Sequence, residues 1–185
     1  MLAVASVLAW WSPATLIDWQ PQLAGSQPWR AWTAAFVHWS GLHLAGNLAG
    51  IAVVGALGLV ARLPPHMALA WFAAWPLTHL SLLLRPELAH YGGLSGVLHA
   101  GVAVAAVWLL VRQRGRRRLI GTAIAAGLLA KIALESPWGP VLRQGAGWDI
   151  KVVPLAHAAG ALAGAVCAGL TLWLRPPARK ATERF

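Results

Sequence analysis

Long apolar segments dominate this sequence and constrain its fold more than any other feature. Six of them follow one another with polar connections between, at about residues 2–17, 42–60, 67–84, 94–111, 119–134 and 152–174. At a rise of 1.5 Å per residue, a helix of about 18 residues covers roughly 27 Å, close to the hydrocarbon thickness of a bilayer. A helix also satisfies its backbone hydrogen bonds within itself, as lipid requires. The pattern predicts an all-α polytopic membrane protein with six transmembrane helices in a single domain over residues 1–185.

The composition supports a membrane location and argues against nucleic acid as a partner. Hydrophobic residues make up 58% of the 185 residues and charged residues 11%, whereas soluble domains carry about 25% charged residues. The net charge of +10 would suit nucleic acid, but the positive charges lie in short clusters between apolar segments, as topology signals do. We therefore expect the lipid bilayer as a partner and no nucleic acid.

The basic residues are distributed unevenly between the two ends of the predicted helices. Ten of the 15 Lys and Arg residues fall on one side, namely Arg62, Arg112, Arg114, Arg116, Arg117, Arg118, Arg175, Arg179, Lys180 and Arg184. The positive-inside rule places this side, both termini and a basic tail over 175–185 in the cytoplasm. In a bacterial inner membrane, the start of the fourth segment would then face the periplasm.

The longest connection, from about Asp18 to Gly41, is rich in tryptophan. Trp19, Trp29, Trp32 and Trp39 give it an aromatic, amphipathic character. Tryptophan is enriched where a membrane meets water, so we expect this connection to lie in the interface.

A serine flanked by glycines opens the fourth apolar segment. Ser95 lies between Gly93 and Gly96, where a loop turns into a helix. Small neighbours let a substrate backbone come close, and the free N–H groups of a helix start point toward the same place. Polar groups in membrane segments are costly and are functional candidates by default. The setting predicts that Ser95 is a nucleophile.

A serine hydroxyl needs a base to accept its proton, and His157 is the only histidine of the sixth segment. Gly160 and Gly164 follow it with the small-x3-small spacing that lets helices approach closely. Packing of the fourth and sixth segments would therefore bring Ser95 and His157 together. Neither helix contains a carboxylate that could orient His157, so we expect a Ser–His dyad without a third member.

A second polar cluster, His38-x4-His43-x3-Asn47, enters the second apolar segment. His43 and Asn47 are four residues apart and share one helix face. Their N–H groups can stabilise the oxyanion of an acyl-transfer intermediate, or they can form hydrogen bonds between helices. His38 is five residues before His43 and no Glu accompanies them, which does not match a zinc-binding HExxH pattern. We expect neither a metal nor a cofactor.

Three further polar residues lie in the apolar segments or at their ends. His99 follows Ser95 by four residues and so lies on the same helix face, where it either stacks against His157 or packs between helices. Lys131 and Glu135 are spaced to form an ion pair, with a role in structure or in docking of a substrate.

Together these residues resemble the rhomboid family of intramembrane serine proteases. The similarity is carried by Trp29-Arg30, His38-x4-His43-x3-Asn47, Gly93-x-Ser95-Gly96 and Ala156-His157-x2-Gly160-x3-Gly164. The resemblance implies a six-helix bundle with a water-filled cavity open to the outer side. It also implies that Ser95 is the nucleophile and His157 the general base, with His43 and Asn47 at the oxyanion. Supporting positions are Gly93, Gly96, His99 and His38.

The local sequence Tyr91-Gly92-Gly93-Leu94-Ser95-Gly96-Val97-Leu98-His99 is most similar to the rhombosortase branch of that family. Many bacterial rhomboids have Tyr at the position of His99. Lys131-x3-Glu135 is also similar to that branch. The resemblance implies substrates that are exported proteins with a C-terminal tag of a Gly-Gly region, a membrane helix and a basic tail. It implies removal of that tag, with the acyl group passed to water or to an amine-bearing acceptor.

Two other functions compete with proteolysis. A catalytically inactive rhomboid-like protein would bind membrane helices without cleaving them, although Ser95 and His157 are both present. A small transporter would use the histidines as a proton relay, but it would be expected to show internal repeats or acidic groups within the spans.

Overall fold

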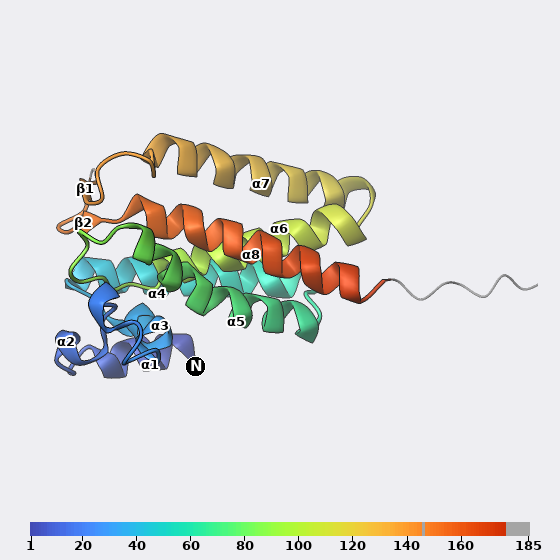
Figure 1. The fold of residues 1–185 in the computed structure, drawn as a ribbon. Helices are drawn as coiled ribbons and strands as arrows, with labels where there is room; N and C mark the ends of the chain where they lie inside the picture. The colour runs from blue at the N-terminus through green and yellow to red at the C-terminus, as the bar shows by residue number, and fades with distance from the viewer. Residues whose placement is uncertain (146, 177–185) are drawn as a thin grey trace, which may run out of the picture.

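The fold is a bundle of long helices with a cluster of short elements against one end (Figure 1). The computed structural model describes residues 1–145 and 147–176. The long helices are α4 (Gly41–Val60), α5 (Pro65–Leu80), α6 (Ser95–Arg112), α7 (Gly115–Glu135) and α8 (Pro154–Leu174). The short elements are α1 (Leu2–Ala9), α2 (Ala14–Ile17), η1 (Pro21–Leu23), α3 (Arg30–Thr33), η2 (Ala34–Phe36), η3 (Ser81–Leu84), β1 (Arg143–Gln144) and β2 (Lys151–Val152).

Within the described residues, four helical segments are long and apolar enough to cross a membrane: Gly41–Val60, Pro65–Leu84, Ser95–Arg112 and Pro154–Leu174. The chain is therefore a multi-pass membrane protein, although the predicted number of six spans is not confirmed. Helix α7 is as long as the others but is charged at both ends, by Arg116 to Arg118 and by Lys131 and Glu135.

The prediction of one continuous helix over residues 2–17 is wrong. Helix α1 ends at Ala9 after eight residues, and a turn separates it from the single turn of α2. Eight residues reach only about 12 Å, far less than a hydrocarbon core. The break precedes Pro13, because a proline disfavours helical backbone in the residue before it.

Helix α6 is the centre of the bundle and packs against α4, α5, α7 and α8. Its closest neighbour is α8, because two glycines of α8 lie on the backbone of α6. A methyl group at Gly160 would collide with the backbone of Gly96, and one at Gly164 would collide with that of Ala100. Gly101 lies on a different face of α6, against Trp71 of α5 and Val54 of α4.

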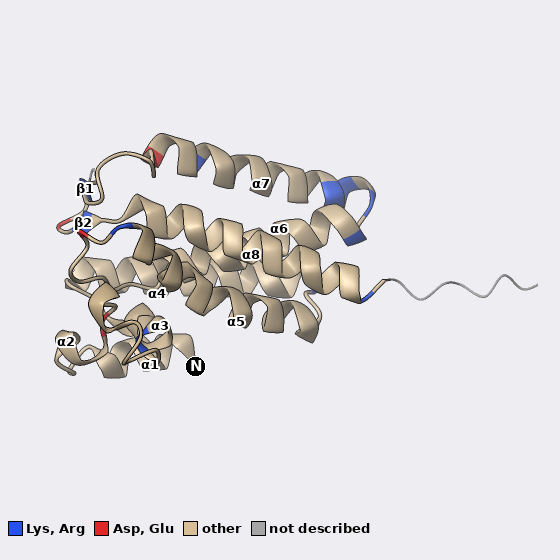
Figure 2. Cartoon of the chain, viewed as in Figure 1, with Lys and Arg blue, Asp and Glu red and all other residues tan. Residues whose placement is uncertain are grey.

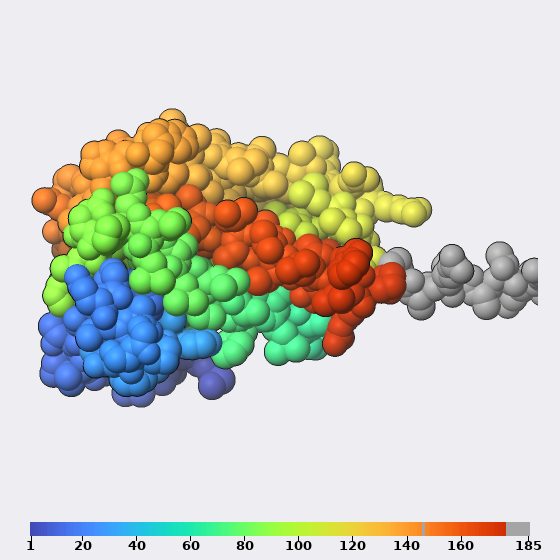
Figure 3. Space-filling model, viewed as in Figure 1, coloured from blue at the N-terminus to red at the C-terminus, as the bar shows by residue number. Residues whose placement is uncertain are grey.

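The outer faces of the helices remain apolar. In the space-filling view, α8 lies at the surface between α5 and α7 (Figure 3). Large hydrophobic side chains are exposed on the long helices, among them Val53, Leu59, Leu69, Phe72, Leu129, Leu162, Leu170 and Trp173. A belt of this kind suits lipid better than water.

The connection before α4 is held by a buried ion pair. The Arg30 guanidinium lies 3.0 Å from an Asp18 carboxylate oxygen and also donates to the carbonyl of Thr15. Trp29, Trp32 and Trp39 are exposed, as expected of interfacial residues, but Trp19 is fully buried. The prediction for Trp19 is therefore wrong: its backbone pairs with Tyr91, and its indole lies in a core cluster with Leu82 and Tyr91.

A cluster of basic residues lies at one end of the bundle, at the turn from α6 to α7, and a further basic residue follows α8 (Figure 2). There Arg112 donates to the carbonyls of Leu172 and Arg175, and Arg117 donates to that of Val60. Ser95 and His157 lie at the opposite end, because they belong to the first turns of α6 and α8. Of the predicted basic tail over 175–185, residues 177–185, with Arg179, Lys180 and Arg184, lie outside the described residues.

Candidate active site

Ser95 and His157 meet at the starts of two adjacent helices. Ser95 is the first residue of α6, and His157 lies in the first turn of α8, which begins at Pro154. The Ser95 Oγ and His157 Nε2 atoms are 2.9 Å apart, a hydrogen-bond distance. The contact exists because α8 lies so close to α6: Gly160 is one turn beyond His157 and packs on Gly96, one residue beyond Ser95.

The expectation that His157 has no carboxylate partner is wrong. Glu135, the last residue of α7, places Oε2 2.7 Å from His157 Nδ1. An ionised carboxylate only accepts hydrogen bonds, so Nδ1 carries the proton and donates it to Glu135. The Nε2 atom is then the acceptor of the Ser95 hydroxyl proton. The carboxylate was missed because it comes from a third helix, 22 residues before His157 in the chain.

Lys131 forms the expected i,i+4 pair with Glu135, with Nζ and Oε1 2.5 Å apart. The two carboxylate oxygens of Glu135 therefore have different partners, one being Lys131 and the other His157. The orientation of the carboxylate is set from both sides.

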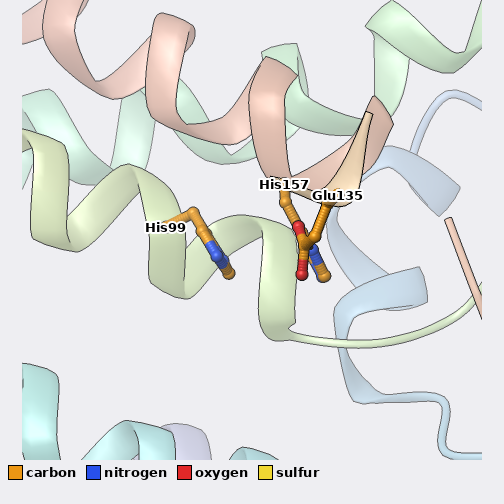
Figure 4. A group of neighbouring side chains, drawn as sticks. All are labelled: His99, Glu135 and His157. Atoms are coloured by element: carbon orange, nitrogen blue, oxygen red, sulfur yellow. The ribbon is translucent and has the colours of Figure 1, made fainter. Parts of the chain in front are cut away.

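His99 stacks on His157, with ring centroids 4.3 Å apart and planes 8° from parallel. Its Nδ1 lies 2.6 Å from the Ser95 carbonyl oxygen, so Nδ1–H donates to that oxygen and holds the ring in place. Figure 4 shows the side chains of His99, Glu135 and His157 next to one another. They come from α6, α7 and α8.

These three residues offer ligand atoms within 4.8 Å of one another. Imidazole lone pairs lie in the ring plane, however, and two stacked, nearly parallel planes do not converge on one ion. The arrangement is suited to holding the His157 ring in place rather than to binding a metal ion.

His43 and Asn47 line the same cavity as Ser95 and His157. The Trp39 backbone N–H lies 3.3 Å from His43 Nδ1, which must therefore be the acceptor, so the proton of the neutral ring sits on Nε2. Asn47 is buried, and its Nδ2 has no hydrogen-bond partner among the described residues. The site thus contains two N–H donors available to a ligand.

The glycines and His38 shape the site without lining it. Gly93 has φ +137°, which favours glycine, and a Cβ there would lie 2.8 Å from His43 Nε2. A Cβ at Gly96 would lie 2.7 Å from the Ala156 carbonyl oxygen. His38 is buried against His43, with ring centroids 5.0 Å apart, and burial lowers the pKa of His38. Its neutral ring supports that of His43.

A cavity of about 750 Å³ contains these groups. Apolar residues of α4, including Gly46, Gly50 and Val53, form one wall, and residues of α7 form the opposite wall. The connection before α8 covers the end of the cavity. A Cβ at Gly46 would meet the Trp148 ring, and the Ser40 hydroxyl lies 2.7 Å from an Asp149 carboxylate oxygen.

The comparisons with known proteins agree with this arrangement at the level of family. The model of the rhomboid domain matches residues 25–174, from the connection before α3 to the end of α8. Among the curated proteins, none matches the chain. The matched range includes every residue of the site and all the candidate spans. The chain therefore belongs to the rhomboid family.

Proposed function

We propose that this protein is an intramembrane serine endopeptidase in which Ser95 is the nucleophile and His157 the general base. The observation that carries the proposal is the hydrogen bond between Ser95 Oγ and His157 Nε2, 2.9 Å long, inside a cavity large enough for a peptide segment. Membership of the rhomboid family supports the same reaction class.

In the first step, Ser95 Oγ attacks a peptide carbonyl carbon while its proton passes to His157 Nε2. The carbonyl oxygen becomes an oxyanion, for which His43 Nε2–H and Asn47 Nδ2–H are the donors. The C–N bond then breaks, and His157 returns the proton to the leaving amine. Water or an amine then attacks the acyl-enzyme and gives a proton to His157. The bond between the acyl carbon and Ser95 Oγ breaks, and His157 returns that proton to Ser95 Oγ.

We propose further that the substrates are exported proteins with a C-terminal tag of a Gly-Gly region, a membrane helix and a basic tail, as in rhombosortases. A helix bounded by small residues unwinds readily at its end, which exposes the peptide bond to the cavity. The site lies at the starts of α6 and α8. The arginine cluster lies at the opposite end of α6, at its turn into α7 (Figure 2). By the positive-inside rule, the site would face the periplasm in a bacterial inner membrane, with both termini in the cytoplasm.

A fluorophosphonate probe distinguishes an active protease from an inactive rhomboid-like helix binder or a transporter. The probe reacts with an activated serine, whose oxygen replaces fluoride on phosphorus. We expect mass spectrometry of the purified protein in detergent to locate the adduct on Ser95. The exposed Ser26 is the matched control, and Ser26→Ala should label like the wild type. A protein that forms no adduct, or forms one elsewhere, would contradict the proposal.

Asn47→Ala should lower kcat by about 10²- to 10³-fold, the usual effect of losing one oxyanion donor. The free energy of unfolding should change little. Asn47 Nδ2 is buried and has no hydrogen-bond partner among the residues described, so removing this amide nitrogen breaks no hydrogen bond that it donates. The measurements are the turnover of a tagged reporter and the thermal midpoint in detergent. Unchanged turnover would remove Asn47 from the oxyanion site.

A further inference from the structure

We propose that Glu135 is a positioning residue that completes a Ser95–His157–Glu135 triad. The inference rests on the proposed protease function. Its basis is the chain of contacts from Ser95 Oγ to His157 Nε2 at 2.9 Å, and from His157 Nδ1 to Glu135 Oε2 at 2.7 Å. Three different helices contribute one residue each to this chain.

The place of Glu135 in α7 supports a role beyond that helix. It is the C-terminal residue, where the helix dipole is negative and a carboxylate is unfavourable. Positive or donating groups surround it: Lys131 Nζ and His157 Nδ1 contact its carboxylate, and Arg143 donates to its backbone carbonyl at 2.6 Å. The following residue, Ser136, turns the chain away with φ 49°. Helix preferences alone disfavour a glutamate at this position. A hydrogen bond from His157 Nδ1 to its carboxylate gives a reason for it.

The chemistry of the carboxylate fits the need of the base. By accepting the Nδ1 proton, Glu135 keeps the His157 tautomer whose Nε2 faces Ser95. When His157 takes the serine proton, the resulting imidazolium lies beside a negative charge. Lys131 occupies the other oxygen of Glu135 and so limits rotation of the carboxylate. His99 covers one face of the His157 ring, which limits its tilting.

A purely structural role is the competing explanation, because the same contact joins the end of α7 to α8. The two explanations predict different losses. If Glu135 only joins the two helices, its loss would lower the thermal midpoint and would reduce activity only through misfolding. A positioning residue would lower kcat in a protein that still inserts, folds and binds its substrate.

The decisive variant is Glu135→Gln, which keeps the shape of the side chain and removes its charge. We expect kcat for a tagged reporter to fall by about 10²- to 10⁴-fold, with KM and the thermal midpoint nearly unchanged. Labelling by fluorophosphonate should slow in parallel. Glu87→Gln is the matched control, because Glu87 is exposed and its nearest cation, Arg85, lies at 3.6 Å. That variant should retain wild-type kinetics.

Chemical rescue of activity is a result that a purely structural role of Glu135 would not produce. In Glu135→Ala, formate can enter the open cavity and take the place of the carboxylate beside His157 Nδ1. We expect formate to restore part of kcat, and chloride at the same ionic strength to restore none. Glu135→Asp, which retains the charge, should keep more activity than Glu135→Gln, even if the Gln variant is poorly folded.

Wild-type kcat in Glu135→Gln, or absence of rescue by formate, would overturn the triad. If Glu135→Gln fails this test while Ser95→Ala is inactive in the same assay, the protease assignment stands and only the role of Glu135 in the triad is rejected. If Ser95→Ala also cleaves the reporter, the proposed function itself has failed, and the triad with it.

Discussion

Ser95→Ala is expected to abolish cleavage of a reporter that carries the C-terminal tag. Without the hydroxyl no acyl-enzyme forms, and loss of such a nucleophile lowers kcat by about 10⁵- to 10⁶-fold. His157→Ala should have a comparable effect, because a serine hydroxyl is a weak nucleophile without its base. The two losses should not add in the double variant, since both residues act in one step.

The measurement is mass spectrometry of the new C-terminus of the reporter, in membranes with and without the protein. It reports the position of the cut and any amine attached to the product. Membrane insertion of both variants should equal that of the wild type. Ser26→Ala, an exposed serine variant, should cleave normally. Cleavage at the wild-type rate by Ser95→Ala would show that another group supplies the nucleophile.

Gly160→Ala is expected to produce the second large loss, although residue 160 touches no substrate. The added methyl group would collide with the backbone of Gly96, which cannot rotate away as a side chain can. Overpacking of a core costs about 1–3 kcal/mol, and we expect the upper end here. The helices α6 and α8 must separate, which lengthens the distance between Ser95 Oγ and His157 Nε2. Misplacement of reacting groups by about 1 Å can lower the rate about 10²-fold.

The matched control is Gly169→Ala on the same helix, where an added methyl group meets nothing within 4 Å. It should keep full activity and a thermal midpoint at or slightly above the wild-type value, because alanine favours helix over glycine. The measurements are thermal unfolding in detergent and reporter cleavage. Equal behaviour of the two alanine variants would contradict the proposed role of the close helix contact.

Residue types and their spacing predicted the rhomboid family and the central contact of the site. Family membership follows from the match over residues 25–174. The contact of Ser95 with His157 was predicted from the glycine spacing of the last segment, and the structure has Gly160 and Gly164 on the backbone of α6. Spacing succeeded here because close helix packing requires small residues, and these are visible in the sequence.

Other features depended on neighbours that the sequence pattern does not identify. Trp19 looked interfacial by its residue type, but its backbone pairing with Tyr91 buries it. The carboxylate partner of His157 comes from α7, a helix that the spacing of the fourth and sixth segments does not involve. Residue type and helical periodicity describe one element at a time. They do not indicate which neighbouring element each buried side chain contacts.

By itself, the sequence determined that the chain is a multi-pass helical membrane protein and that Ser95, His157, His43 and Asn47 lie at the ends of its apolar segments. These properties are local, because hydrophobicity and helix period are set by residues near one another in the chain. Only the tertiary structure decided that Glu135 joins His157. That contact depends on the path of α7 and of the connection after it, which brings the end of one helix beside the start of another.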